Sequence, residues 1–254
     1  VWELILTNIP FTIMSELTAA NQLANLLVLY LTTPATDFYI TKIIQKSSNP
    51  TLEPFNTNNI DLGSFSVMGS ALSVSLESLS ISGLSNIQIA KENSKPKITI
   101  NGDQITFYAV RPNTEAPPAG IPPNLIINTQ IKITSDGDAS PLVPIVITVL
   151  NGNLVGVFNT SGDASVPTTV QIKFTSATVQ ADATPANITF DLSNLDSFTK
   201  PMIESYLNQT STLTMLIQKL NGELASQSVL NSLSQGATQA AQSTLKSIIK
   251  KKKI

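Results

Sequence analysis

The stretch SALSVSLESLSISGLSNIQIAKENSKPKITINGDQITFYAV, which runs from Ser70 to Val110, decides the fold of this chain. Apolar and polar residues alternate along its first part, as they do in a β-strand with one buried face. That part continues for about twenty residues, whereas strands in globular proteins usually have three to ten. A ribbon of this length is too long for a compact sandwich, and it favours a sheet that curls around something else.

The apolar residues of this ribbon change parity once. The first set is even-numbered and consists of Leu72, Val74 and Leu76. The second set is odd-numbered and consists of Leu79 and Ile81. A shift of one residue would send the second set to the opposite face of the sheet. A β-bulge within about two residues of Ser78 keeps both sets on one face and bends the strand. We therefore expect residues 70–90 to form one continuous, strongly bent strand, with Gly83 as a second point of bending.

Further strands follow, each ended by turn residues. Asn101 and Gly102 can supply the positive φ angles of a tight turn, so residues 98–109 are predicted to form a hairpin. A second hairpin is predicted at Asn151–Asn153. We expect the polar residues 47–63 to form a loop. The alternation of apolar residues predicts the remaining strands within 127–133, 142–150, 154–158, 170–179 and 188–192.

Helices are predicted on both sides of the strands. Residues 14–31 have helical composition but are apolar all round, which favours a buried helix over one inserted in a membrane. Thr199 can cap a helix that has Pro201 in its first turn. The segment 199–248 carries a helical stripe of apolar residues, namely Ile203, Leu207, Leu213, Leu216, Ile217, Leu220 and Leu224.

These patterns indicate an α+β fold, in which a long, highly curved antiparallel sheet wraps around a long C-terminal helix and an N-terminal helix. We expect residues 1–254 to form a single domain. Its expected parts are an N-terminal helical segment at 1–45, the curved sheet at 64–192, the C-terminal helices at 199–248 and a basic tail at 249–254.

The composition limits the chemistry that the chain can perform. It contains no Cys and no His, which removes thiolate chemistry and the commonest general base and metal ligand. The acidic residues are scattered, so we expect no catalytic constellation, no metal site and no cofactor. Only 13% of the residues are charged although 42% are hydrophobic, so the surface must consist largely of uncharged polar residues. A binding protein is a better expectation than an enzyme.

The charge is distributed unevenly. Lys246 and Lys250–Lys253 hold 5 of the 15 basic residues, which leaves 10 basic and 17 acidic residues elsewhere, a net charge of −7. Arg111 is the only arginine in the sequence, so nucleic-acid binding is not expected. The lysines at 250, 251, 252 and 253 are consistent with a disordered solubilising end, a tether to an anionic membrane surface, or an appended sequence without function.

The sequence is compatible with several cellular locations. No run of 18 apolar residues occurs, so no transmembrane segment is expected. A removed signal peptide would leave no trace. Secreted, periplasmic and cytosolic locations are therefore all compatible with the sequence.

The segments SLESLSISGLSNIQI, ITINGDQITFYAV, NLIINTQIKIT and DLSNLDSFTKPMIESYLN, with the later LIQKLNGEL, resemble the tubular lipid-binding (TULIP) superfamily. The resemblance covers residues 65–225 and rests on pattern rather than on an invariant motif. The superfamily includes bactericidal/permeability-increasing proteins, takeout and juvenile-hormone-binding proteins, membrane-contact domains and bacterial OrfX-type proteins of neurotoxin gene clusters. The disulfide and the cationic face of some secreted members are missing here, so cysteine-free bacterial or cytosolic members are the better comparison.

The resemblance implies an apolar tunnel that holds a lipid or another hydrophobic ligand. It leaves a second possibility open, in which side chains close the tunnel and the protein acts as a scaffold through protein partners, for example as a component of a toxin complex. If a tunnel exists, the inward faces of the ribbon and the helices at 14–31 and 202–220 should form its wall. The candidate residues are Leu23, Leu27, Leu76, Ile81, Ile105, Phe107, Phe174, Leu213 and Ile217.

Overall fold

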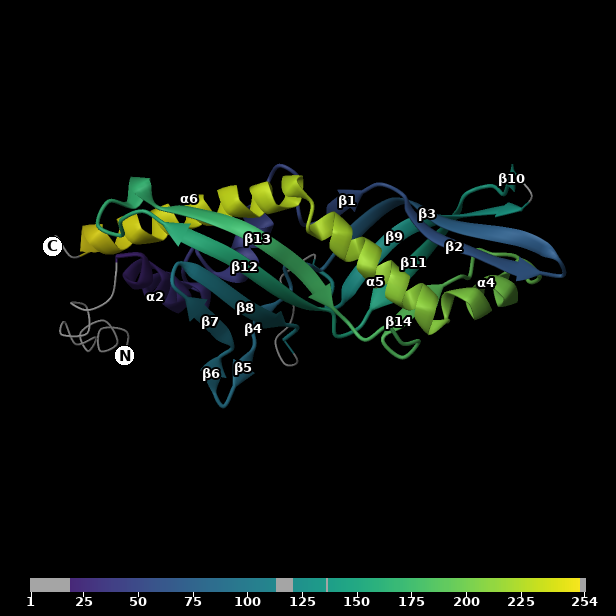
Figure 1. Cartoon of the computed structure of the whole chain (residues 1–254), viewed down its shortest axis with the longest axis horizontal. Coiled ribbons are helices and arrows are strands. Elements are labelled where there is room, and N and C mark those ends of the chain that lie inside the picture. The colour runs from purple at the N-terminus through teal and green to yellow at the C-terminus, as the bar shows by residue number, and fades with distance from the viewer. Residues whose placement is uncertain (1–18, 113–120, 136, 252–254) are drawn as a thin grey trace.

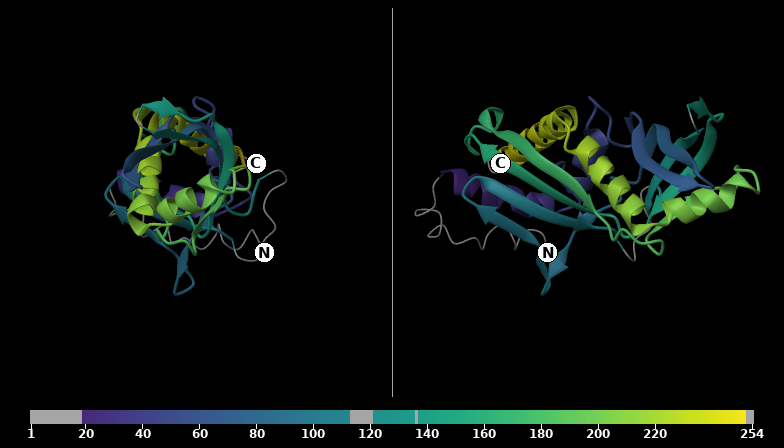
Figure 2. Two further views of the ribbon diagram at one scale, coloured as in Figure 1. Left: turned by 90° about the vertical axis from the view of Figure 1, so that its right-hand side faces the viewer. Right: turned by 45° about the vertical axis from the view of Figure 1, so that its right-hand side comes forward.

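The chain forms an elongated α+β structure, in which two antiparallel sheets lie end to end and helices run along them (Figure 1). The computed structural model describes residues 19–112, 121–135 and 137–251. The view along the long axis shows strands and helices arranged in a ring (Figure 2, left). The fold class expected from the sequence is confirmed, but the expected single sheet is divided into two.

The larger sheet has seven strands and occupies one end of the molecule, which we call the B end. Its central path has the order β1-β3-β9-β11-β14, while β2 pairs with β3 and β10 pairs with β9. The strands are β1 (Phe55–Thr57), β2 (Ile60–Val67), β3 (Ser70–Ser82), β9 (Leu125–Ser135), β10 (Asp138–Ala139), β11 (Val143–Val149) and β14 (Ile188–Asp191).

The smaller sheet has five strands and occupies the other end of the molecule. We call it the C end, a name that refers to this sheet and not to the carboxyl terminus. Its path has the order β13-β12-β8-β4, and β7 pairs with β8. The strands are β4 (Gln88–Ile89), β7 (Ile98–Asn101), β8 (Gln104–Val110), β12 (Asn153–Ser161) and β13 (Gln171–Gln180). A small two-stranded ribbon, β5 (Lys91–Glu92) and β6 (Lys95–Pro96), projects beside it (Figure 1).

The helices are divided between the two ends. At the C end, α6 packs on β13 and α3, and α2 packs on β12 and β7. At the B end, α5 packs on β2 and α4, and it also reaches β13 of the other sheet. Their bounds are α2 (Ala19–Leu31), α3 (Ile40–Lys46), α4 (Thr199–Leu207), α5 (Thr210–Leu224) and α6 (Gln227–Lys251), with a 3₁₀ turn η2 at Pro167–Thr169. Residues 14–18 of the expected N-terminal helix lie outside the described residues.

The expected bulge in the first ribbon is confirmed, whereas the expected continuity of residues 70–90 is wrong. The pairing of β3 with β9 shifts between Glu77 and Ser80, and Ser78 has a φ angle of 55°. Strand β3 then ends at Ser82, and β4 belongs to the other sheet. The ribbon therefore bends at its bulge but stops before residue 83.

An elbow at Gly83 turns the chain from one sheet to the other. Gly83 has a φ angle of 91°, and a Cβ atom there would lie 2.3 Å from the carbonyl oxygen of Asn124. The carboxylate of Glu53 accepts hydrogen bonds from the backbone N–H groups of Gly83 and Ser85, at 2.6 and 2.7 Å. The buried guanidinium of Arg111 donates to the carbonyl oxygen of Gly83. These contacts satisfy backbone groups that strand pairing would otherwise have used.

Three other expectations need correction. Asn151–Asn153 is not a hairpin turn, because β11 pairs within the seven-stranded sheet and β12 within the five-stranded one. The polar segment 47–63 contains β1 and the start of β2, so the sheet begins before residue 64. Thr199 does not cap α4; the carboxylate of Asp196 accepts the N–H groups of Phe198 and Thr199, both at 2.9 Å. The hairpin at 98–109 is confirmed by the pairing of β7 with β8.

Candidate functional site

The structure separates the nine residues predicted from the sequence into two groups. Leu76 and Ile81 on β3 and Leu213 on α5 belong to the B end, and each is at most 1% exposed. Ile217, also on α5, is only half-buried and lies where the two sheets meet. The C-end group is fully or almost fully buried and consists of Leu23, Leu27, Ile105, Phe107 and Phe174. No single tunnel wall is formed by all nine.

Aromatic side chains fill the interior of the C end. The ring of Phe158 lies 5.2 Å from that of Phe174 and 6.1 Å from that of Phe107, measured between centroids. Phe38, from the segment before α3, meets Phe158 edge-on at 6.3 Å. On β12, a Cβ atom added to Gly156 would lie 2.2 Å from Cζ of Phe107. Phe38 and Phe158 were not among the nine candidates, because nothing in their sequence segments indicates that they face the same interior.

The interior of the B end is mainly aliphatic, with Phe55 of β1 as a buried exception, and a stacked aromatic pair closes its side. The rings of Phe65 on β2 and Tyr206 on α4 stack at 4.3 Å. The hydroxyl of Tyr206 donates a hydrogen bond of 2.5 Å to the carbonyl oxygen of Leu62. On β1, the Thr57 hydroxyl donates to the carboxylate of Glu223 on α5. Side chains of α4 and α5 thus form hydrogen bonds with polar groups of the strands at this edge of the sheet.

A comparable seam closes the open edge of β13 at the C end. Backbone N–H groups of Ile172 and Phe174 donate to the hydroxyls of Thr238 and Ser234 on α6, both at 2.9 Å. Near the other end of β13, Asn221 of α5 accepts the N–H of Val179 at 2.7 Å and donates to its carbonyl oxygen at 3.0 Å. An uncovered edge strand would present these groups to other chains. Side chains of α5 and α6 therefore bind the edge of β13 at positions where a neighbouring strand would otherwise pair.

The most promising cavity lies at the junction of the two sheets, and we call it the junction cavity. Its volume is about 470 Å³, and it lies against the turn between β11 and β12, the end of β13 and the side of α5. Its lining residues are Asn151, Asn153, Val179, Gln180, Ala181, Asp182 and Ile217. Of the residues predicted from the sequence, only Ile217 contributes to it.

The junction cavity combines apolar and polar walls. Val179 is buried, and Ala181 and Ile217 are half-buried, so one wall continues into the core. The amides of Asn151 and Asn153 and the exposed carboxylate of Asp182 supply the polar wall. Ile217 and Asn221 are four residues apart on α5, so they share a helix face. The hydrogen bonds between Asn221 and Val179 therefore form one border of the cavity.

A second groove, of about 340 Å³, follows the seam between β13 and α6. Its lining residues are Gln171, Ile172, Ser234, Gln235, Thr238, Gln239 and Gln242, and carbon atoms form most of its wall. The amide of Gln242 already donates to the carbonyl oxygen of Val170 at 2.9 Å. Because Thr238, Ser234 and Gln242 are used to hold the seam, this groove is a weaker candidate for a ligand site.

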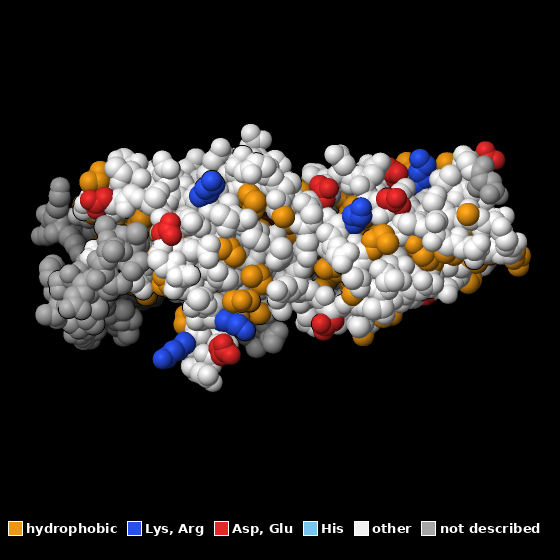
Figure 3. Space-filling model, viewed as in Figure 1, with side chains coloured by type: hydrophobic (Ala, Val, Ile, Leu, Met, Phe, Trp, Pro, Cys, Tyr) orange, Lys and Arg blue, Asp and Glu red, His pale blue; other side chains and the backbone are white. Residues whose placement is uncertain are grey.

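The charged groups do not assemble into a reactive site in the part of the chain that the structure describes. No cluster of three or more acidic side chains there could hold a metal ion. Burial lowers the pKa of Arg111 to about 10, which still leaves its guanidinium charged at neutral pH. Charged side chains are few and scattered on a mainly uncharged surface (Figure 3). None of the described helices is both long and apolar enough to cross a membrane.

Comparison with solved structures shows a likeness of shape. The chain is similar to the crystal structure of takeout 1 from Epiphyas postvittana, with 13% sequence identity and a TM-score of 0.49. The match covers 80% of this chain and 87% of that one. No protein-family model matches the sequence, and no curated protein matches it.

Proposed function

We propose that this protein binds a lipid or another hydrophobic small molecule without chemical conversion, and that the ligand enters at the junction cavity. The observation that carries this proposal is the cavity itself, which lies between the two sheets and α5. Its volume of about 470 Å³ falls within the range of small-molecule sites, roughly 300–1,000 Å³. Such sites combine mostly apolar walls with a few polar groups that orient the ligand, and the junction cavity has a larger polar share, with about half of its wall polar.

The walls of the cavity suit an amphiphilic molecule. Ile217, Val179 and Ala181 offer an apolar surface to a hydrocarbon chain. Asn151 and Asn153 can donate hydrogen bonds to the polar head of a ligand. The carboxylate of Asp182 repels an anionic head group, and the repulsion grows with the charge of that group. An uncharged or singly charged head group therefore fits better than a multiply charged one.

The hydrocarbon chain of such a ligand needs a path into the core. Val179 borders the core on its other side, since a Cβ atom on Gly152 would lie 3.5 Å from Cγ1 of both Val179 and Val149 and 4.0 Å from Cβ of Leu125. The path opens if α5 separates from the end of β13. That separation breaks the two hydrogen bonds of Asn221 but no strand pairing. Each such bond contributes only about 0.5–1.5 kcal/mol, so these bonds themselves oppose the opening only weakly.

Uptake of a fluorescent fatty acid tests the proposal. We expect the natural sequence to bind the probe, and Ile217→Trp to block binding while the melting temperature changes little. Ile248→Trp is the matched control, since Ile248 is another half-buried isoleucine on a helix, far along α6 from the cavity. Leu76→Trp enlarges a fully buried position and should cost about 1–3 kcal/mol of stability. Absence of uptake by the natural sequence would overturn the proposal.

A second function is favoured by the aromatic interior of the C end. Phe38, Phe107 and Phe158 are fully buried and in ring contact, which leaves no lined channel between them. In this alternative the core is closed, and the protein acts through protein partners. No uptake by the natural sequence would favour it. An OrfX-type relationship and membrane contact through the lysines at 250–253 stay predictions.

A further inference from the structure

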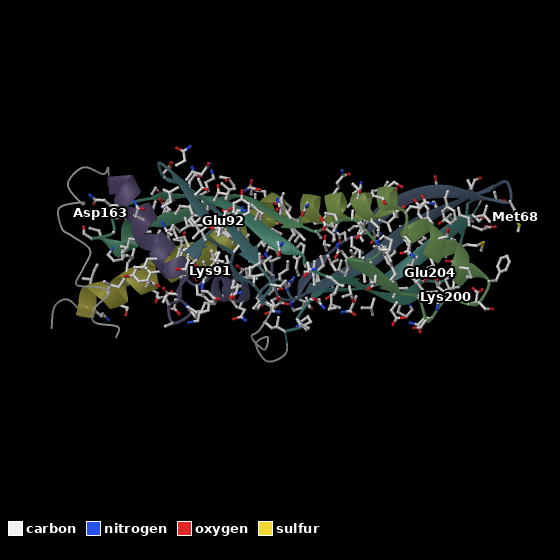
Figure 4. The ribbon with its side chains drawn as sticks, turned by 90° about the horizontal axis from the view of Figure 1, so that it is seen from below. Met68, Lys91, Glu92, Asp163, Lys200 and Glu204 are labelled. Atoms are coloured by element: carbon white, nitrogen blue, oxygen red, sulfur yellow. The ribbon has the colours of Figure 1, made fainter. Side chains whose placement is uncertain are left out.

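Two large apolar side chains project into solvent at the B end of the molecule. Met68, in the turn between β2 and β3, is 96% exposed, and Phe198, directly before α4, is 71% exposed. We call these two residues the apolar tip. Figure 4 shows Met68 at the extreme end of the molecule, with Lys200 and Glu204 of α4 near the same end. The two side chains come from segments 130 residues apart.

The backbone at Met68 makes its position unusual. Met68 and Gly69 have φ angles of 51° and 90°, so the two-residue turn between the strands is of the type that needs positive φ at both positions. Asn, Asp or Gly normally occupies the first of these positions, because other side chains are strained there. A residue held in such a conformation points to a functional role when no contact explains it. Met68 at 96% exposure has no packing that would explain it.

Phe198 is held outside the fold by the cap of α4. The carboxylate of Asp196 accepts hydrogen bonds from the N–H groups of Phe198 and Thr199. These bonds fix the backbone at the start of α4 and lower the pKa of Asp196 below its usual range. Phe198 therefore stays exposed because its backbone is anchored, and not because its segment is loose.

Met68 and Phe198 reach a similar distance beyond the stacked rings of Phe65 and Tyr206. Met68 follows Phe65 by three residues of strand, or about 10 Å. Phe198 precedes Tyr206 by eight residues, of which most are helical, or about 12 Å. Strand β2 and helix α4 both extend toward this end of the molecule (Figures 1 and 2). Two side chains of similar reach at one end can meet one flat surface together.

We propose that the apolar tip inserts into a lipid surface whose head groups are zwitterionic and carry no net charge. No charged residue occurs from Leu62 to Leu76, so the whole hairpin end can enter the head-group region without burying a charge. The chain outside its lysine-rich end carries a net charge of −7, which disfavours an anionic surface. Asp196 and Lys200 flank Phe198 and would stay in water.

A second copy of the chain fits this surface less well. Even if both side chains were buried completely, they would contribute on the order of 400 Å². A specific protein interface needs about 1,000 Å² or more. Protruding side chains at a convex tip also need a matching pocket in a protein partner, whereas a lipid surface deforms around them. The inference is independent of the proposed ligand, because adsorption to lipid requires no opening of the junction cavity.

Vesicle flotation of the full chain tests the inference. We expect the natural sequence to float with vesicles of pure phosphatidylcholine. Met68→Ser combined with Phe198→Ser should weaken this binding by about tenfold or more, because each side chain loses the free energy of burial in an apolar medium. Val166→Ser is the matched control. Val166 is also exposed, at 46%, and it is close in sequence to Asp163, which lies at the opposite end of the molecule (Figure 4).

A labelling experiment provides a measurement that does not depend on removing both side chains. The chain has no Cys, so Met68→Cys can be labelled at one position with a polarity-sensitive dye. We expect its emission to shift to the blue when phosphatidylcholine vesicles are added, and Val166→Cys to show no shift. Failure of the natural sequence to bind these vesicles would overturn the inference.

Other outcomes would also overturn it. Binding that requires phosphatidylserine, and that disappears when the lysines at 250–253 are replaced by Gln, would assign lipid contact to the other end of the chain. Concentration-dependent dimers that the combined Ser variant abolishes would assign the tip to a second copy.

Discussion

The two ends of the molecule close their interiors with different side chains. At the C end, Phe38, Phe107, Phe158 and Phe174 interlock, and Gly156 leaves only enough room for a neighbouring ring. At the B end, the interior is mainly aliphatic, while Met68 and Phe198 face solvent. One end therefore buries its aromatic side chains in ring contact, whereas the other leaves large apolar side chains exposed. The junction cavity lies between them.

The largest expected effect separates the packed end from the exposed tip. Phe158→Ala should lower the free energy of unfolding by about 3–5 kcal/mol, because it leaves a cavity among three aromatic rings. Met68→Ala should change it by less than about 0.5 kcal/mol. Chemical denaturation measures both. A small loss for Phe158→Ala would mean that the C end is loosely packed and could itself hold a ligand.

A second comparison applies one substitution to two glycines. Gly156→Ala should cost about 1–3 kcal/mol, because its methyl group would overlap the ring of Phe107. Gly222→Ala should stabilise the protein by about 0.4–1 kcal/mol, because Gly222 lies within α5 with nothing near its Cβ position. Melting temperatures that move in opposite directions would support the described packing. Melting temperatures that both rise or both fall would contradict the described surroundings of one of these glycines.

A third substitution tests the seam that borders the junction cavity. Asn221→Ala removes both hydrogen bonds to Val179 and should cost about 1–3 kcal/mol. It should also make uptake of a fluorescent fatty acid faster, because α5 then separates more readily from β13. Gln218→Ala is the control, since Gln218 is an exposed residue of α5. Slower uptake by Asn221→Ala than by this control would show that the seam does not limit entry.

The smallest expected effect concerns an ion pair at the C end. Hydrogen bonds from Lys46 and Ser243 lower the pKa of Asp37 below its ordinary value of 3.8. Its stabilising contribution is therefore complete above that value and is lost as the pH falls through the lowered pKa. Because the pair is exposed, Asp37→Asn should cost only about 0.2–1 kcal/mol near neutral pH.

The difference between Asp37→Asn and the natural sequence should vanish in acid well below pH 3.8. Denaturation curves at several pH values measure it. A difference that persists unchanged in acid would mean that the charge of Asp37 contributes nothing.

Local patterns in the sequence predicted local structure well. The change of parity between Leu76 and Leu79 predicted the bulge at Ser78, because the pleat of a strand allows no other way to keep both residues buried. Asn101 and Gly102 predicted the hairpin at 98–109 for a similar reason, since tight turns need residues that adopt positive φ. Apolar spacing likewise predicted the C-terminal helices.

Long-range features could not be predicted in the same way. Nothing local distinguishes the turn at Asn101 from that at Asn151, yet the first closes a hairpin and the second leads the chain from one sheet to the other. The division of the sheet depends on contacts of Gly83 with Glu53 and Arg111, which are remote in sequence. For the same reason, eight of the nine candidate residues lie away from the junction cavity, and only Ile217 lines it. Inward-facing apolar residues look alike in sequence, whether they pack together or line a space.

Native mass spectrometry of the freshly purified protein tests ligand binding most directly. We predict a species heavier than the polypeptide by the mass of one lipid-sized molecule, which organic extraction removes and incubation with a fatty acid restores. The mass of the bare polypeptide, unchanged after incubation with the fatty acid, would contradict the proposed function and favour a closed core.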